Sequence, residues 1–322
     1  MTNLSKLMKF TALALAWGCG LVHAQSYPNR PVKIVVPFAA GGPADNYARF
    51  MALRLGEELK QSFVIDNKPG AGSIIGTEFA AKSPADGYTL LMMSNTQTVN
   101  ESLVPNKPFA LMKDFVGIAP VNYSNLLLVV HPSVPVKSVA ELVALAKSKP
   151  GKLNYASSGN GTPYHMAGEL FKYMAGIDMT HVPYKGSSGA RTDTVGGQVD
   201  LMFDAETTMA VMSREGKVRA LAGTGLARST NLPDMPTVAE TVPKYEATIW
   251  LGLMAPKGTP AEVVNKLNAE VRKIVNNPDV KAAWAKQGAV PMSMTVSEFD
   301  QYLNADIAKW ANIVKISGAK PD

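Results

Sequence analysis

A glycine-rich loop after a predicted strand is the first feature of this sequence that could do chemistry. Val32 to Val36 is rich in β-branched residues and predicts a buried strand, and a helical pattern of apolar residues begins near Ala44. Gly41-Gly42 lies between them. This order of strand, turn and helix exposes backbone N–H groups at a helix N-terminus, where the helix dipole also attracts anions. We interpret the loop as a carboxylate-binding loop, and the alternative is a tight turn whose glycines serve steric needs only.

A second loop of similar design follows the predicted strand from Leu153 to Tyr155. Residues 157–162 combine glycines with serine and threonine hydroxyls, and Pro163 occupies the first turn of the next predicted helix. We expect the two loops to face each other across a cleft, the first supplying N–H donors and the second supplying N–H and hydroxyl donors. A charge-assisted hydrogen bond contributes roughly 1.5–3 kcal/mol. A few of them therefore suffice for a micromolar carboxylate, which needs about 8 kcal/mol.

Further candidates lie at strand ends and early in helices. Ser94 and Thr96 follow the strand that begins at Tyr88, and Asp204 follows the strand 199–203. The predicted ligand-binding residues are Phe38, Ala39, Ala40, Gly41, Gly42, Asp45, Ser94, Thr96, Ser157, Ser158, Gly159, Gly161, Thr162, His165, Lys185 and Asp204.

Four of these residues have a structural alternative. Asp45 accepts hydrogen bonds either from a ligand amine or water, or from N–H groups in the first turn of its own helix. Asp204 either contacts a ligand amino group or organises loop donors. Packing is the favoured interpretation for His165. Lys185 either neutralises a carboxylate or is an exposed loop lysine.

The sequence lacks the motifs of common enzymes. It contains no G-x-S-x-G, Walker A or H-E-x-x-H motif. His131, His165 and His181 are isolated and lack metal-ligand spacing, so we expect no metal and no cofactor. The enzyme alternative is a secreted hydrolase that pairs Ser157 or Ser158 with His165. That histidine lies just downstream of the serines, an awkward place for a base that a third group must orient, so we predict that the protein is not an enzyme.

The N-terminus predicts an export signal. Two lysines precede an apolar run from Phe10 to Val22, and Ala24 fits the small-residue cleavage pattern. We therefore predict that residues 1–24 are a signal peptide, cleaved after Ala24, and that the mature protein is periplasmic. The single cysteine, Cys19, lies in this segment, which leaves the mature chain without disulfides or thiolate metal sites.

The charge of the mature chain favours small anions as ligands. Loss of Lys6 and Lys9, with no acidic residue removed, lowers the formal net charge from +6 to +4. A mild positive balance attracts anionic solutes. The basic residues are scattered among acidic ones, which argues against a nucleic-acid partner.

Predicted strands alternate with predicted helices along the whole chain, which indicates an α/β protein with mostly parallel sheets. The chain of 322 residues is long for one sheet. The connections near Tyr123 and Thr248 are natural crossing points. We predict that residues 25–124 and 248–322 form lobe 1 and that residues 125–247 form lobe 2.

Eight sequence blocks make the chain resemble the periplasmic solute-binding receptors of tripartite tricarboxylate transporters, the Bug or TctC-like family. The blocks occur in the family's order and cover essentially the whole mature chain. They are PFAAGG (37–42) with Asp45, NKPGAG (67–72), DGYTL (86–90), SSGNG (157–161) with His165, HVPYKG (181–186), MFD (202–204), LPDMPTVAE (232–240) and APKGTP (255–260).

The resemblance implies a two-lobed Venus-flytrap fold of type II-like topology, with the ligand held between the lobes by loop backbone amides and ordered waters. It implies a monomer that captures a small carboxylate, either a di- or tricarboxylate or an aromatic carboxylate. The carboxylate would then pass to a membrane permease of a tripartite tricarboxylate transporter. A ligand sensor that feeds a signalling partner is the other function the family allows. Ala205 departs from the Asn that often follows Asp204 in the family, and this difference could alter the ligand.

Overall fold

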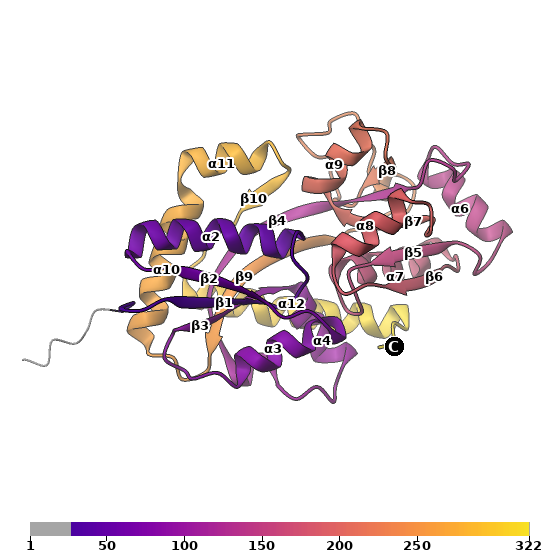
Figure 1. Cartoon of the computed structure of the whole chain (residues 1–322). Coiled ribbons are helices and arrows are strands. Elements are labelled where there is room, and N and C mark those ends of the chain that lie inside the picture. Colours follow the sequence, from indigo (N-terminus) through magenta and orange to yellow (C-terminus); the bar gives the residue numbers. More distant parts are fainter. Residues whose placement is uncertain (1–26, 322) are drawn as a thin grey trace, which may run out of the picture.

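The computed structural model describes residues 27–321, and Figure 1 shows their arrangement. The predicted signal peptide lies outside the described residues. None of the helices in residues 27–321 has the length and apolar character that a membrane span requires. The strands are β1 (Val32–Val36), β2 (Phe63–Asn67), β3 (Thr89–Ser94), β4 (Phe115–Val130), β5 (Asn154–Ser157), β6 (Thr180–Pro183), β7 (Leu201–Ala205), β8 (Arg219–Gly223), β9 (Thr248–Pro256) and β10 (Ala289–Pro291). The helices are α2 (Pro43–Leu59), α3 (Ile74–Ala81), α4 (Asn95–Leu103), α5 (Leu111–Asp114), α6 (Val139–Ser148), α7 (Pro163–Ala175), α8 (Ser187–Val195), α9 (Glu206–Arg214), α10 (Ala261–Asn276), α11 (Pro278–Ala285) and α12 (Val296–Ser317), with 3₁₀ turns η1 (Ala71–Ser73) and η2 (Val238–Glu240).

The strands form one curled, ten-stranded sheet in the described part of the chain. Its order is β2-β1-β3-β9-β4-β7-β5-β6, and β8 and β10 also pair with β4. β4 belongs to both halves of the sheet, because β9 pairs with its residues 115–125 and β7 pairs with its residues 126–130. The result is a two-lobed α/β fold, which confirms the predicted fold class.

The sheet is mixed, so the expectation of mostly parallel sheets is wrong. Among the residues that the structure describes, β1 pairs in parallel with β2 and β3, and β5 pairs in parallel with β6 and β7. The other five pairings are antiparallel, and each of them contains β4 or β9. These two strands carry the chain between the halves, so they run against the strands that each half builds locally. Two apolar runs of the sequence, near residues 115–120 and 126–130, are parts of this one 16-residue strand β4.

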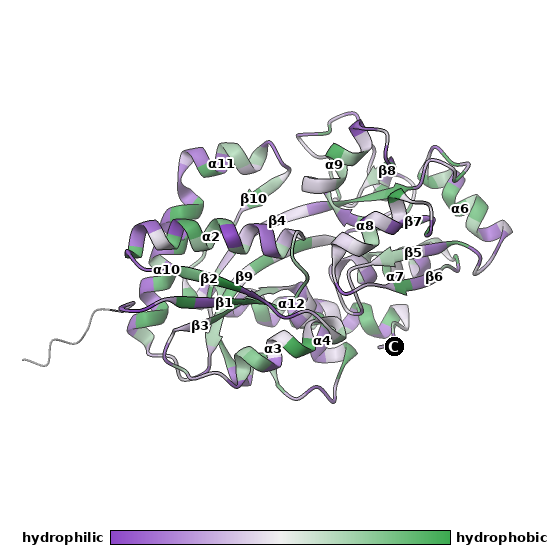
Figure 2. Ribbon diagram, in the orientation of Figure 1, coloured by the Kyte–Doolittle hydropathy of each residue, from purple (hydrophilic) through white to green (hydrophobic). Residues whose placement is uncertain are grey.

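Helices cover both faces of the sheet, because successive side chains of a strand point to opposite faces. In β1, Ile34 and Val35 belong to different hydrophobic cores, and in β4 Leu127 and Leu128 do the same. Figure 2 shows hydrophobic and hydrophilic residues alternating along the ribbon of α2. This pattern is expected for a helix that packs one of its faces against a sheet and exposes the other to solvent.

The last helix, α12, packs into both halves. Phe299 and Leu303 near its start lie in a core of the first half, whereas Trp310 and Ile313 near its end lie in the largest core of the second. The sequence predicted the start of this helix from a capping box. Thr295 accepts a hydrogen bond from the backbone N–H of Glu298, which confirms that prediction.

Candidate functional site

A small cavity of about 20 Å³ lies between the two halves of the molecule. The walls come mainly from the β1–α2 and β5–α7 connections, which are the two glycine-rich loops singled out in the sequence. The lining residues are Phe38, Ala39, Gly42, Pro43, Ala44, Ser94, Thr96, Ser158, Pro163, Tyr164, Ser187 and Ile249.

Helix N-termini converge on this cavity. Within residues 27–321 four helices contribute residues of their first turn to its lining: Pro43 and Ala44 of α2, Thr96 of α4, Pro163 and Tyr164 of α7, and Ser187 of α8. The N-caps of α2 and α8 are glycines, so no side chain caps these helix ends. No charged side chain lines the cavity in the described part of the chain. The positive ends of the helix dipoles therefore set its electrostatic character, which favours a bound anion.

Asp45 holds the β1–α2 loop in shape. Its carboxylate accepts hydrogen bonds from the backbone N–H of Gly41 (2.9 Å), Nε of Arg49 (3.0 Å) and Nδ2 of Asn67 (3.0 Å). Gly41 has φ +79°, a left-handed conformation that favours glycine. Burial alone would raise the pKa of Asp45, but the three hydrogen bonds outweigh burial and lower that pKa below 3.8.

We expect the variant Asp45→Asn to change the pH dependence of stability. A carboxyl group with a lowered pKa stabilises the fold above its ordinary pKa, here 3.8, and this contribution is lost as the pH falls through the lowered value. The variant should therefore lose about 1–3 kcal/mol of unfolding free energy at neutral pH. Below the ordinary pKa, the unfolding free energy of the variant should also fall less steeply with decreasing pH than that of the parent protein. Urea unfolding across roughly pH 3 to 7 measures both effects.

The control for this prediction is Asp234→Asn, because Asp234 is exposed in the connection after β8. Stability curves that run parallel for the Asp45→Asn variant and the parent protein would contradict the assigned role.

The β5–α7 loop is held by Thr162 and His165. Gly159 and Gly161 have φ +125° and +70°. Thr162 Oγ1 donates to the carbonyl of Gly159 (2.7 Å) and accepts from the backbone N–H of His165 (3.4 Å). The backbone N–H of Gly161 donates to Nδ1 of His165 (3.0 Å). His165 thus fixes the turn that leads into α7.

The Ser157 side chain lies in a packed histidine cluster. Its Oγ is 2.6 Å from Nε2 of His181, whose ring stacks on Tyr155 (4.9 Å between centroids). The same ring stacks on His165 (4.1 Å). Ser157 is fully buried, and its hydroxyl also contacts the backbone of Gly159. A nucleophile must reach its substrate, so this geometry does not favour Ser157 as the nucleophile of the hydrolase alternative.

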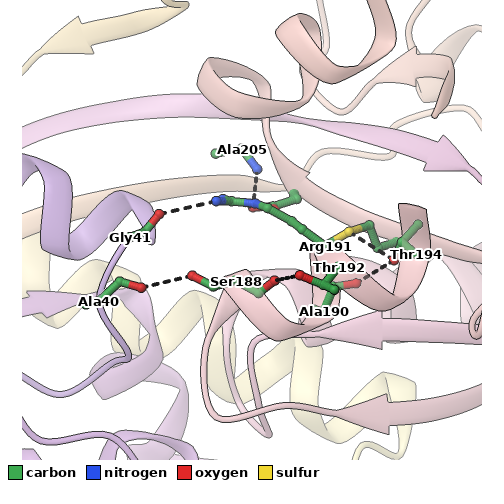
Figure 3. A network of polar contacts seen from close by, with 10 residues as sticks. Ala40, Gly41, Ser188, Ala190, Arg191, Thr192, Thr194 and Ala205 are labelled. Atoms are coloured by element: carbon green, nitrogen blue, oxygen red, sulfur yellow. Dashed lines mark hydrogen bonds and ion pairs between the residues drawn. The ribbon is translucent and has the colours of Figure 1, made fainter. Parts of the chain in front are cut away.

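Two hydrogen bonds cross the cleft from α8 to the β1–α2 loop, as Figure 3 shows. Ser188 Oγ donates to the carbonyl of Ala40 (2.9 Å), and Nη1 of Arg191 lies 3.5 Å from the carbonyl oxygen of Gly41. A trans peptide group directs its C=O and N–H in opposite directions. The N–H of Gly42 therefore points away from Arg191 while the carbonyl of Gly41 points toward it. These contacts join the two halves in a closed arrangement.

Arg191 also forms a buried ion pair, which the sequence did not reveal. Its Nε lies 2.5 Å from Oδ2 of Asp204 and its Nη2 lies 3.1 Å from Oδ1. Burial lowers the pKa of Arg191, but the adjacent carboxylate outweighs burial and raises it. Asp204 also accepts from the backbone N–H of Ala205 (2.7 Å). A carboxylate at the end of a buried strand requires a counter-charge, and that requirement was the available signal for Arg191.

Tyr164 lines the cavity and is a second residue that the sequence did not reveal. Burial first, and then the charge of Asp204, raise the pKa of its phenol well above 10.0, so the hydroxyl keeps its proton. Ser187 and Asp204 lie close to this hydroxyl. Among residues 27–321, however, it has no hydrogen bond of good geometry. The phenol is therefore a donor held next to the cavity.

The structure places the predicted ligand-binding residues in three groups. Six line the cavity: Phe38, Ala39, Gly42, Ser94, Thr96 and Ser158. Gly159 and Lys185 line a neighbouring cavity, together with Phe38 and Ser158. The rest line neither cavity and lie in or beside the loops: Ala40, Gly41, Asp45, Ser157, Gly161, Thr162, His165 and Asp204. In the part of the chain that the structure describes, no three His, Cys, Asp or Glu side chains are grouped to hold a metal ion.

The fold and the cavity together define a two-lobed solute-binding receptor of the periplasmic-binding-protein class. The sequence model for the tripartite tricarboxylate transporter family receptor matches residues 47–319. The chain therefore belongs to this family, which confirms the resemblance seen in the sequence.

Relatives and solved structures agree with this assignment. Protein BugT of Bordetella pertussis is 37% identical over 325 residues, covering 99% of each chain. The structure of R. palustris Rpa4515 with adipate superposes with a TM-score of 0.89 at 36% identity, covering 92% of this chain and 100% of that one. MatC (Rpa3494) from Rhodopseudomonas palustris with bound malate gives a TM-score of 0.85 at 32% identity, covering 89% of this chain and 100% of that one.

Proposed function

We propose that this protein captures a small carboxylate between its lobes and delivers it to the membrane permease of a tripartite tricarboxylate transporter. One observation carries the proposal: four helix N-termini in the described residues meet at a cavity whose lining has no charged side chain. Partial positive charges from backbone N–H groups suit a carboxylate. Bound adipate and malate in two homologous structures support the same ligand class.

Closure of the lobes would couple ligand binding to recognition by the permease. The proposed lobes are residues 25–124 with 248–322, and residues 125–247. The contacts from Ser188 and Arg191 to the β1–α2 loop form only when the lobes meet. A ligand that touches both loops stabilises the closed state by its differential affinity for that state. We further propose that the protein is a periplasmic monomer without enzymatic activity, exported by a signal peptide that is cleaved after Ala24.

A thermal-shift screen of the exported form tests the proposal. The screen should include mono-, di- and tricarboxylates, aromatic acids and amino acids, with calorimetry for any hit. A ligand at one hundred times its dissociation constant adds about 2.7 kcal/mol of stability, because it binds only the folded state. We expect at least one carboxylate to give a shift of this size, and uncharged amides of the same acids to give none.

The same screen can overturn the proposal. If no carboxylate raises the melting temperature and the protein instead turns over an ester substrate, the receptor function fails and the hydrolase alternative gains support.

A further inference from the structure

Glu206 is a buried carboxyl group at a contact between the two halves of the molecule. It is the first residue of α9, in the second half, and only 1% of it is exposed. Gly288, which precedes β10 in the first half, packs directly against it, because an ideal Cβ on Gly288 would lie 2.5 Å from Oε1 of Glu206. Figure 1 shows α9 and the end of α11 next to each other at this contact. Backbone of one half thus covers the carboxyl group of the other.

The carboxyl group of Glu206 is incompletely paired. Its Oε1 accepts a hydrogen bond from the hydroxyl of Ser229 (2.6 Å), whereas its Oε2 has no partner in the described part of the chain. Buried polar groups are nearly always paired. Among residues 27–321, no arginine, lysine or histidine nitrogen lies within 4.0 Å of this carboxyl group. A charged carboxylate is costly to bury without a counter-charge, so these surroundings favour the neutral acid.

The charged residues on the surrounding elements do not supply the missing counter-charge. These residues are Asp204, Arg214, Arg228, Asp279, Lys281 and Lys286. Asp204 pairs with Arg191 and Arg228 pairs with Glu240, and the other four are exposed, where solvent screens them. Burial raises the pKa of Glu206 above its ordinary value of 4.5, and the nearby Ser229 and Asn231 side chains lower it only in part.

Only some of these influences change when the lobes close. Glu206 is at the N-terminus of α9, which favours its charged form, but this position is the same in the open and closed states. Closure adds the contact with Gly288, whose N–H donates to the carbonyl of Ala285, the last residue of α11 (3.0 Å). Closure therefore removes water from the carboxyl group and brings it to a helix C-terminus, whose partial negative charge also disfavours a carboxylate. Both changes favour the neutral acid in the closed state.

The interface around Glu206 is small enough to separate. Beside the Gly288 contact, Asn231 Nδ2 donates to the carbonyl of Ala285 across the same boundary. A cavity of about 350 Å³ lies next to these contacts, and residues of α2, α9 and α11 line it. The helix α9 thus meets the first half over a limited area, so a hinge movement can part the two and expose Glu206 to water.

We propose that closure of the lobes takes up one proton at Glu206 and is therefore favoured by a falling pH. This proposal rests on the function proposed above, because the ligand stabilises the closed state. A group that binds its proton more strongly in the closed state favours closure wherever it is protonated in that state and ionised in the open one. The gain is complete below the ordinary pKa of 4.5 and is absent above the raised pKa of the closed state.

Calorimetry with the variant Glu206→Gln across roughly pH 5 to 8 tests the proton uptake. The probes are adipate, malate and any other carboxylate that the thermal-shift screen finds. Glutamine keeps the shape of the neutral acid but binds no proton. We expect the variant to bind more tightly than the parent protein at the alkaline end. The two affinities should converge as the pH falls, by up to about tenfold per pH unit. Comparing both proteins with the same probe cancels the ionisation of the probe.

The control for charge is Glu215→Gln, which removes the same charge from an exposed position at the other end of α9. Its affinities should follow those of the parent protein at every pH. Buffers of different ionisation enthalpy give a second readout. The parent protein and Glu215→Gln should take up protons on binding, up to one per molecule more than Glu206→Gln.

The variant Gly288→Ala tests whether the contact belongs to the ligand-bound state. Its Cβ would collide with Glu206, so its affinity for the probes should fall by roughly tenfold or more. Adding Glu206→Ala removes the obstructing carboxyl group and should restore most of the affinity. Gly216→Ala is the matched control, because Gly216 also has a positive φ (+71° against +82°) and an added Cβ there meets nothing within 4 Å.

The outcomes separate the proton uptake from the proposed function. The uptake is wrong if Glu206→Gln and the parent protein show parallel pH dependence, or if they take up equal numbers of protons. It is also wrong if Gly288→Ala binds as tightly as Gly216→Ala, or if Glu206→Ala does not relieve the defect. In each of these cases the parent protein still binds a carboxylate, and the proposed function stands. If the parent protein binds none of the probes at any pH, both proposals fail.

Discussion

A single methyl group at Gly72 should abolish tight ligand binding. An ideal Cβ on this residue would lie 2.5 Å from the carbonyl oxygen of Asn160, which belongs to the β5–α7 loop on the other side of the cleft. The obstructing atom is backbone, so the two loops must separate to make room. If separating the loops raises the free energy of the closed state by about 3 kcal/mol relative to the open state, the apparent affinity for ligand falls roughly a hundredfold.

Gly176→Ala is the matched control for Gly72→Ala. Gly72 and Gly176 have nearly the same backbone conformation, with φ +56° and +61°, so alanine imposes a similar strain at both sites. An added Cβ at Gly176 meets nothing within 4 Å. Calorimetry with the carboxylate found in the screen measures affinity, and small-angle scattering measures closure. If Gly72→Ala binds as tightly as Gly176→Ala, the Gly72–Asn160 contact does not form in the liganded state.

The second large effect is expected on stability, from the variant Arg191→Met. Arg191 and Asp204 are both buried and form two hydrogen bonds with each other. Methionine keeps much of the apolar stem of arginine but removes the counter-charge. A buried carboxylate without its partner costs about 3–5 kcal/mol, and we expect a loss of this size in urea unfolding.

The double variant Arg191→Met with Asp204→Asn distinguishes the loss of charge pairing from the loss of packing. With no buried charge left, the double variant should recover much of the lost stability, since replacing both partners of a buried ion pair is often nearly neutral. A double variant that is no more stable than Arg191→Met would assign the loss to packing. A single variant that loses less than about 1 kcal/mol would mean that water reaches Asp204.

The elements with short-range signals were predictable from the sequence. A run rich in β-branched residues predicted β1, and the capping box at Thr295 predicted the start of α12. The glycine-rich loops predicted the two main walls of the cavity. A turn that needs a positive φ favours glycine, so such turns can be recognised from the sequence alone. The family blocks indicated that both loops belong to one receptor.

The parts that depend on long-range contacts were not predictable. Arg191 lies 150 positions from Gly41, whose carbonyl it approaches, and no local pattern encodes that contact. Ile249 reaches the cavity because β9 returns from the second half of the sheet, which also makes the sheet mixed. Periodicity describes which face of a strand is buried, but it does not give the direction in which the neighbouring strand runs.

The helix α12 has a consequence for how the molecule unfolds. Phe299 lies in a core of one half, and Trp310, three turns further along the same helix, lies in a core of the other. If either core unfolds, α12 is released and the core of the other half loses the side chains that this helix contributes. The stability of each half therefore depends on that of the other. Unfolding should therefore be cooperative across the whole molecule, even though the chain is long enough for two independent domains. A protease in the periplasm would then meet either the intact receptor or a fully open chain, with few half-folded molecules between them.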